Sequence, residues 1–159
     1  MGVVSNRDVP TKLIKDFFEQ NWGSPEMVIS SGSYDCTKLE GFTFLNEKNE
    51  MIGLITYTMI EDECEIISLD SLEEGKGIGT TLLQSVEDMA MNNNCNLVKL
   101  VTTNDNLLAL KFYQKRGYSL SQILCNAVDE ARKLKPEIPL IGNDGIPIRD
   151  EIVLQKVFK

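Results

Sequence analysis

One stretch of the sequence decides the fold, a glycine-rich loop that runs straight into a helical pattern: EEGKGIGTTLL, residues 73–83. Glycines at 75, 77 and 79 allow the backbone to approach a ligand without interference from a Cβ atom. A helix that begins here directs unpaired N–H groups and a partial positive charge at an anion. The loop lacks the P-loop lysine, and Leu82 stands where the dinucleotide fingerprint has its third glycine. By itself the pattern fits either a pyrophosphate site or a tight strand-to-helix turn.

A second segment follows about twenty-five residues later, NLLALKFYQKRGY, residues 106–118. Asn106, Ala109 and Tyr113 are spaced i, i+3 and i+7, so they share one face of a helix, and the small Ala109 leaves room between two polar tips. Apolar residues cover much of the remaining circumference, which predicts a well-buried helix: Leu107, Leu108, Leu110 and Phe112. On this evidence Tyr113 is either a core aromatic with a satisfied hydroxyl or an acid at the end of a ligand.

The hydrophobic pattern divides the chain near residue 75. Before it we expect a helix over 8–20, with Pro10 in its first turn, and a short strand over 27–31. Strands over 41–45, 51–60 and 64–69 follow, joined by short polar turns as an antiparallel meander. After it, helices over 77–93 and 106–116 alternate with strands over 97–101 and 118–124, a βαβαβ rhythm that implies locally parallel pairing. A helix over 126–134 capped by Asn126, a loop, and a strand over 151–158 complete the chain.

Length and charge limit the classes of function. The chain has 159 residues, which predicts one domain over 1–159. Its formal net charge of −8 argues against nucleic acid or an anionic membrane as a partner. There is no histidine, which removes the commonest base and metal ligand and excludes a Ser-His-Asp or Cys-His arrangement. We therefore expect no metal.

Four cysteines lie about thirty residues apart, at positions 36, 64, 95 and 125, without zinc-ligand spacing. No signal peptide or long apolar run is apparent, so the pattern favours free thiols in a reducing cytoplasm. Each cysteine is best interpreted as a small buried hydrophobic residue.

The two segments together resemble the GNAT superfamily of acetyl-CoA-dependent N-acetyltransferases. The signature loop [R/Q]-x-x-G-x-[G/A] is matched by Gly77-Ile78-Gly79, and the second signature by Asn106, Ala109, Tyr113, Gly117 and Tyr118. The match covers residues 41 to 124. It implies an α/β (α+β) GNAT fold, in which an antiparallel N-terminal meander joins splayed parallel central strands with flanking helices.

The resemblance also implies the site and the reaction. The cofactor arm would bond to backbone groups of Leu69, Asp70 and Ser71 between the splayed strands 64–69 and 97–101, and Asn106 would bind the same arm. N–H groups would hold the pyrophosphate at Gly75, Lys76, Gly77, Ile78, Gly79 and Thr80. A substrate amine would attack the acetyl carbonyl directly in a ternary complex. A backbone N–H near Leu69 would polarise that carbonyl, and Tyr113 would protonate the departing thiolate.

Three features of the site stay open. Glu74 stands at the family's Arg or Gln position, beside a polyanion, with Lys76 expected to offset part of the repulsion. The base is either Glu65 or Asp70, or no base is needed if the amine arrives neutral. In the family, segments such as 126–150 shape the acceptor pocket, and its polar candidates are Asp144, Arg149, Asp150 and Glu151, mostly more typical of turns and caps.

The acceptor is expected to be a small-molecule or peptide amine, and the protein a monomer or a homodimer. One alternative is a catalytically weak protein of the same fold that binds acyl-CoA as a sensor or structural subunit, which Glu74 favours. A nucleotide-binding module that uses the glycine loop for ATP is another, although the P-loop lysine and a metal-binding carboxylate pair are absent.

Overall fold

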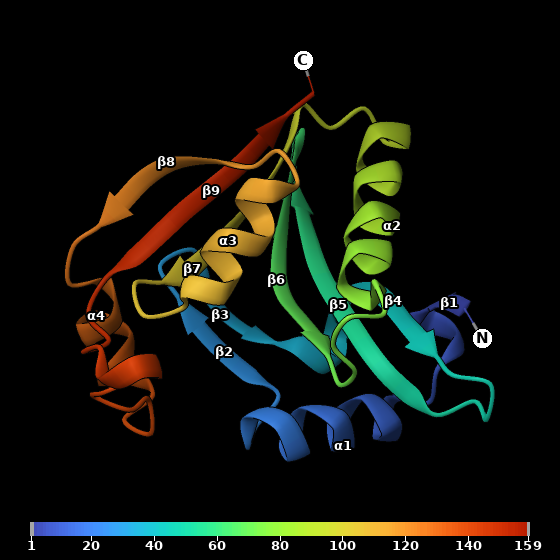
Figure 1. Cartoon of the computed structure of the whole chain (residues 1–159), viewed down its shortest axis with the longest axis horizontal. Helices are drawn as coiled ribbons and strands as arrows, with labels where there is room; N and C mark the ends of the chain where they lie inside the picture. The colour runs from blue at the N-terminus through green and yellow to red at the C-terminus, as the bar shows by residue number, and fades with distance from the viewer. Residues whose placement is uncertain (1, 159) are drawn as a thin grey trace. The chain divides into compact units, whose positions relative to one another are not determined.

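The computed structural model describes residues 2–158 and contains the predicted mixture of strands and helices (Figure 1). The α-helices are α1 (Thr11–Trp22), α2 (Ile78–Asn92), α3 (Leu107–Lys115) and α4 (Ala127–Leu134). The strands are β1 (Gly2–Ser5), β2 (Glu26–Ile29), β3 (Gly32–Asp35), β4 (Glu40–Leu45), β5 (Met51–Ile60), β6 (Glu63–Ser71), β7 (Leu97–Thr103), β8 (Ser119–Leu124) and β9 (Glu151–Val157). Within residues 2–158, no helix is both long and apolar enough to cross a lipid bilayer.

The described chain forms two compact units. The first contains residues 2–27, 34–98 and 158, and the second contains residues 28–33 and 99–157. Strands β2, β3 and β7 cross the boundaries of this division.

The first unit contains the antiparallel meander that the sequence predicts. Strands β1, β4, β5 and β6 lie side by side in that order, and each pairs antiparallel with its neighbour. Its hydrophobic core excludes solvent, and the fully buried side chains in it include those of Phe18, Leu54, Ile55, Leu82 and Val86. Burial of this kind is the main favourable term in folding.

Helix α2 packs against β4, β5 and β6 (Figure 1). A Cβ atom at Gly53 would lie 2.6 Å from Ile78 and 3.0 Å from Leu82, so glycine allows the start of α2 to approach β5. Successive strand residues point to opposite faces, so Leu54 and its partner Asp70 face away from α2. The indole of Trp22, the last residue of α1, bonds to Asp70 on that second face.

Strand β6 contains a bulge that changes which residues share a face. Thr56 pairs with Ser68 and Tyr57 with Ile66, so Ile67 is an extra residue without a partner. Leu54, Thr56 and Thr58 alternate along β5, and their partners on β6 are Asp70, Ser68 and Glu65. Because directly opposed residues point to the same side, those three polar residues line one face of β6.

The second unit corrects the predicted parallel pairing of strand 118–124. Strand β9 lies between β7 and β8, and β8 pairs antiparallel with β9 from Ser119↔Gln155 to Leu124↔Glu151. Alternation of helix and strand indicates parallel neighbours only when no later strand enters the sheet between them. Here β9 lies between β7 and β8, so these two strands are not neighbours.

Most predicted boundaries are confirmed to within a few residues, and β5 begins and ends at the predicted positions. Helix α1 begins at Thr11 instead of residue 8, with Pro10 at the N-cap and Asn6–Asp8 in a separate 3-10 turn. Strands β1 and β3, each of four residues, were not predicted. Gly117 has the expected left-handed conformation after α3, with φ of 93°.

Candidate functional site

The glycine loop leaves the start of α2 open. Gly75 and Gly77 have φ values of 76° and 72°, and beyond the adjacent residues no atom lies within 4 Å of the position that a Cβ would occupy at either glycine. Gly77 is the N-cap of α2 and provides no side-chain hydrogen bond to the first turn. The first backbone N–H groups of a fifteen-residue helix therefore point out of the loop, which is the usual arrangement for binding an anion.

The charged side chains around this loop pair with one another. Lys76 Nζ lies 3.5 Å from Glu73 Oε2, and Glu74 is exposed. The pairing of Lys76 with Glu73 differs from the prediction that Lys76 offsets Glu74. The loop carries a net negative charge, so attraction for an anion has to come from its backbone.

The three residues Leu69, Asp70 and Ser71 end strand β6 just before the loop. Leu69 and Ser71 pair with Ile55 and Gly53 and so lie on the α2 face, and Ser71 Oγ donates a 3.0 Å hydrogen bond to the carbonyl oxygen of Glu73. Asp70 lies on the α1 face, where Trp22 Nε1 donates a 2.9 Å hydrogen bond to Asp70 Oδ2.

The Asp70 carboxyl group is electrostatically unusual. Its partial burial disfavours the charged form and raises the pKa to about 6, while the hydrogen bond from Trp22 opposes that increase. Trp22 was missed by the sequence analysis. The available signal was that it is the only tryptophan and ends the apolar pattern of α1.

The second predicted segment has the expected helix but a different environment. Asn106 Oδ1 accepts a 3.1 Å hydrogen bond from the N–H of Ala109, so this side chain caps α3. Tyr113 is buried and makes edge-to-face contacts with Phe112 and Tyr118, at centroid distances of 5.1 and 5.5 Å. The prediction that α3 is well buried is wrong, because Tyr113 is its only buried residue and Leu108 is 77% exposed.

Two open cavities lie in the first unit. One, of about 630 Å³, is beside the glycine loop and includes Lys48, Lys76 and Ile78 in its lining. The other, of about 560 Å³, runs along α1 and has an apolar floor, including Leu13 and Leu72, with carboxylates at Asp8, Asp16 and Glu50. Of the predicted cofactor residues, only Lys76 and Ile78 line either cavity.

Comparison with known proteins decides the family. The model of the acetyltransferase (GNAT) family matches residues 10–118. The chain belongs to the GNAT family of acetyltransferases. The uncharacterized proteins YxbD and YdhI of Bacillus subtilis (strain 168) are 54% identical over 156 residues and 53% identical over 158 residues, covering 98% and 99% of both chains, respectively. A GNAT family acetyltransferase from Elizabethkingia anophelis, solved with acetyl-CoA bound, is 26% identical with a TM-score of 0.67, over 77% of this chain and 78% of that chain. The predicted resemblance and fold class are both confirmed.

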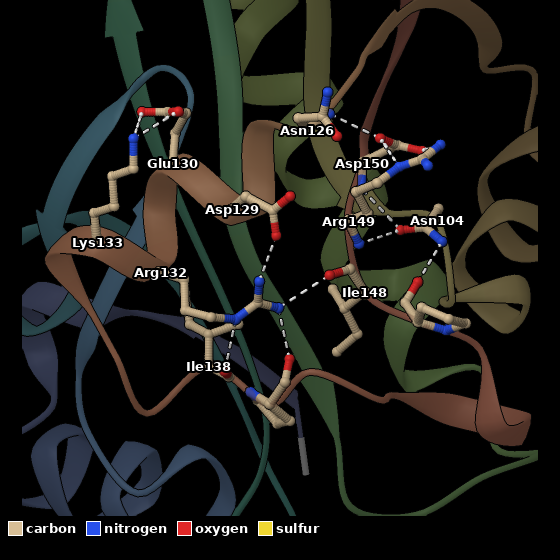
Figure 2. A network of polar contacts seen from close by, with 12 residues as sticks. Asn104, Asn126, Asp129, Glu130, Arg132, Lys133, Ile138, Ile148, Arg149 and Asp150 are labelled. Atoms are coloured by element: carbon tan, nitrogen blue, oxygen red, sulfur yellow. Dashed lines mark hydrogen bonds and ion pairs between the residues drawn. The ribbon is translucent and has the colours of Figure 1, made fainter.

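The segment 126–150 of this GNAT protein is held by its own polar contacts (Figure 2). Arg132 donates hydrogen bonds to the carbonyl oxygens of Ile138, Pro139 and Ile148 and forms an ion pair with Asp129 at 2.7 Å. A single guanidinium therefore connects both ends of the loop that follows α4, because its several N–H donors bond to different carbonyl oxygens at the same time.

Two of the predicted polar candidates of this segment, Arg149 and Asp150, have structural partners. Arg149 and Asp150 form a 3.0 Å ion pair, which lowers the pKa of Asp150, and Asp150 Oδ1 also accepts the N–H of Asn126 (Figure 2). Asn126 is the N-cap residue of α4, as predicted, but its φ is 62° and its side chain makes no capping hydrogen bond. Asp144 also has a left-handed conformation, with φ of 57°.

Two buried carboxylates in the second unit organise loops. Asp105 accepts hydrogen bonds from Thr103 Oγ1 at 2.5 Å and from the N–H of Asn143 at 3.0 Å, and a Cβ at Gly142 would clash with this carboxylate. Glu151, which is 1% exposed, accepts the N–H of Ser30 at 3.1 and 3.2 Å. Glu151 was predicted as an acceptor-pocket candidate, but its observed contact is with the β2–β3 turn.

Among residues 2–158, no group of three or more His, Cys, Asp or Glu side chains is arranged to hold a metal ion. Cys36, Cys64 and Cys95 are buried free thiols, and burial raises the pKa of Cys64 to about 12. Cys125 is exposed, so its interpretation as a buried hydrophobic residue is wrong.

Proposed function

We propose that this protein is an N-acetyltransferase that moves an acetyl group from acetyl-CoA to a primary amine. The observation that carries the proposal is the open start of α2, where Gly75 and Gly77 leave the first N–H groups of the helix facing outward. Membership of the GNAT family and the acetyl-CoA bound in the Elizabethkingia anophelis protein support acetyl-CoA as the donor.

In this proposal each predicted residue has a defined task toward the cofactor. The pyrophosphate accepts hydrogen bonds from backbone N–H groups of residues 75–80, which does not require a cationic side chain. The backbone of residues 69–71 bonds to the pantetheine arm. The amide group of Asn106 contacts the same arm through its N–H donors, since its oxygen already caps α3.

The reaction is a direct transfer in a ternary complex. Proximity and orientation of the amine and the thioester supply much of the acceleration. A backbone N–H near Leu69 stabilises the negative charge that develops on the carbonyl oxygen. Tyr113 donates its phenolic proton to the departing sulfur, and burial among aromatic rings holds this side chain in one orientation.

The acceptor is a small-molecule or peptide amine. The net charge of −8 favours a cationic acceptor over nucleic acid or an anionic membrane. We propose a cytoplasmic location, consistent with the free thiols, and an assembly no larger than a homodimer. Segment 126–150 shapes the acceptor pocket, with Arg132 and Asp105 holding the loop in place.

A second candidate is a sensor that binds acyl-CoA with little turnover. The exposed Glu74 favours it, because an acid replaces the usual Arg or Gln beside the cofactor phosphates. Calorimetry with acetyl-CoA and with ATP, next to CoA release in the presence of a pooled amine library, separates the candidates. Binding of acetyl-CoA with turnover of an amine supports the transferase. Acetyl-CoA binding without turnover on any amine supports the sensor, and preferential binding of ATP contradicts both.

A further inference from the structure

The Trp22–Asp70 pair stands out among the polar contacts of the first unit. Trp22 is half exposed at the end of α1, yet its indole N–H makes a 2.9 Å hydrogen bond to a carboxylate forty-eight positions later. Among the described residues, this is the only hydrogen bond to the Asp70 side chain. One carboxylate oxygen is therefore fixed by the indole, and within residues 2–158 no side chain or backbone group bonds to Oδ1.

The position of Asp70 in the chain connects it with the proposed chemistry. It is the neighbour of Leu69, whose backbone is proposed to polarise the acetyl carbonyl. Asp70 is half-buried, whereas Glu65, the other candidate base, is only 5% exposed on the same face of β6. Between them, Ser68 is buried and its hydroxyl lies 2.6 Å from that of Thr56. An arriving amine can reach Asp70 more readily than Glu65.

We propose that Asp70 is the base that takes a proton from the acceptor amine, and that Trp22 is the residue that positions its carboxylate. This inference rests on the proposed acetyltransferase function. As the C–N bond forms and the C–S bond breaks, one amine N–H proton passes to Asp70 Oδ1 and the thiolate takes the phenolic proton of Tyr113. Asp70 then releases its proton to solvent, and solvent reprotonates Tyr113, so the enzyme returns to its starting state.

The charged groups around the pair support this assignment. Lys15 and Glu19 lie on the same side of α1 as Trp22, at i−7 and i−3, and they pair with each other at 3.9 Å. Glu65 is the other acid on this face of β6. None of them contributes to the pKa of Asp70, which is raised to about 6 by burial and lowered by the indole N–H. A carboxylate with this pKa is ionised at neutral pH and is a stronger base than an ordinary aspartate.

The single tryptophan provides a test that needs no acceptor. Because Trp22 is the only indole in the chain, its fluorescence reports directly on the protonation of Asp70. We expect the emission of the wild-type protein to titrate with a midpoint near pH 6, and Asp70→Asn to remove this transition. Glu19→Gln, which changes an exposed acid on the same side of α1, is the matched control and keeps it. Persistence of the transition in Asp70→Asn overturns the pairing.

Kinetics then test the role in catalysis with any amine that the library identifies. Asp70→Asn is expected to lower kcat by about a hundredfold or more while acetyl-CoA binding is retained. Trp22→Phe removes the N–H that lowers the pKa of Asp70, so the acid limb of kcat/KM moves to higher pH, and a thermal melt verifies that this variant folds.

The outcomes separate the inference from the function on which it rests. If wild-type protein turns over an amine and Asp70→Asn keeps its kcat, only the assignment of the base is overturned. An acid limb that stays in place in Trp22→Phe overturns the positioning role. If no amine is turned over, the transferase proposal and the base both fail, whereas the fluorescence titration still decides the Trp22–Asp70 pair.

Discussion

Glu65 and Asp70 lie on the same face of strand β6 although five positions separate them. In an uninterrupted strand an odd separation places two side chains on opposite faces. The extra residue Ile67 shifts the alternation by one, so the pairs Thr58↔Glu65 and Leu54↔Asp70 bring both acids to the α1 face. The bulge therefore places both candidate bases on one face of β6. Only one of them, Asp70, accepts a hydrogen bond from the indole of Trp22 at the end of α1.

The raised pKa of Asp70 predicts a stability change with pH. The folded-state pKa of about 6 exceeds the unfolded value of 3.8, so the native state binds the proton more tightly and stability falls as pH rises from about 4 to 6. Asp70→Asn removes this penalty. After discounting for solvent screening, we expect about 1 kcal/mol of added stability above pH 6.

Thermal melts at several pH values check this prediction. The variant is expected to melt about 2–4 °C above wild type at pH 7.5, with a difference that shrinks toward pH 4. The exposed control Glu19→Gln is expected to show no such trend. If Asp70→Asn melts below wild type at pH 7.5, the ionised carboxylate of Asp70 does not destabilise the native state, and the prediction is wrong.

Tyr113→Phe tests the acid. Loss of the phenolic proton donor is expected to lower kcat by about a hundredfold, while the calorimetric Kd for acetyl-CoA changes by less than about twofold. Tyr118→Phe is the matched control, because Tyr118 is also buried and contacts Tyr113 edge to face at 5.5 Å. Equal losses of kcat in the two variants would indicate a packing role for Tyr113.

Gly77→Ala tests the anion site at the start of α2. An alanine held at φ of 72° is strained by about 1–2 kcal/mol, and relief of that strain would turn N–H groups away from the cofactor. We expect acetyl-CoA binding to weaken about tenfold or more. Gly23→Ala has a similar φ of 80° in similarly open space at the end of α1, and should lose stability without losing affinity. If Gly77→Ala and Gly23→Ala bind acetyl-CoA with the same affinity, the glycine loop is not part of the cofactor site.

Glu74→Gln tests the departure from the family pattern. Glu74 is exposed, and the cation nearest to it in the loop, Lys76, is paired with Glu73. Removal of one negative charge beside a polyanion is therefore expected to leave acetyl-CoA binding unchanged or to strengthen it a few-fold, most clearly at low salt. Clear weakening in calorimetry would assign Glu74 a positive role in binding.

The sequence alone determined the elements that depend on local patterns. The period of its apolar residues located α1, α2, β5 and β6, and the glycines at 75 and 77 located the turn before α2, because only glycine adopts those φ values without strain. The Asn-Ala-Tyr spacing identified one face of α3 and, with the glycine loop, the family.

Tertiary structure decided the features that join distant segments. The insertion of β9 beside β8, the bulge at Ile67 and the bond from Trp22 to Asp70 depend on partners that lie up to forty-eight positions apart. Exposure of Leu108 on an apolar-looking helix likewise depends on what lies against α3, which a helical period does not specify. A period fixes which residues share a face of one element, but the environment of that face is set by contacts across the fold. The glycine loop could thus be recognised in the sequence. The carboxylate proposed as the catalytic base, Asp70, could be distinguished from Glu65 only in the folded chain.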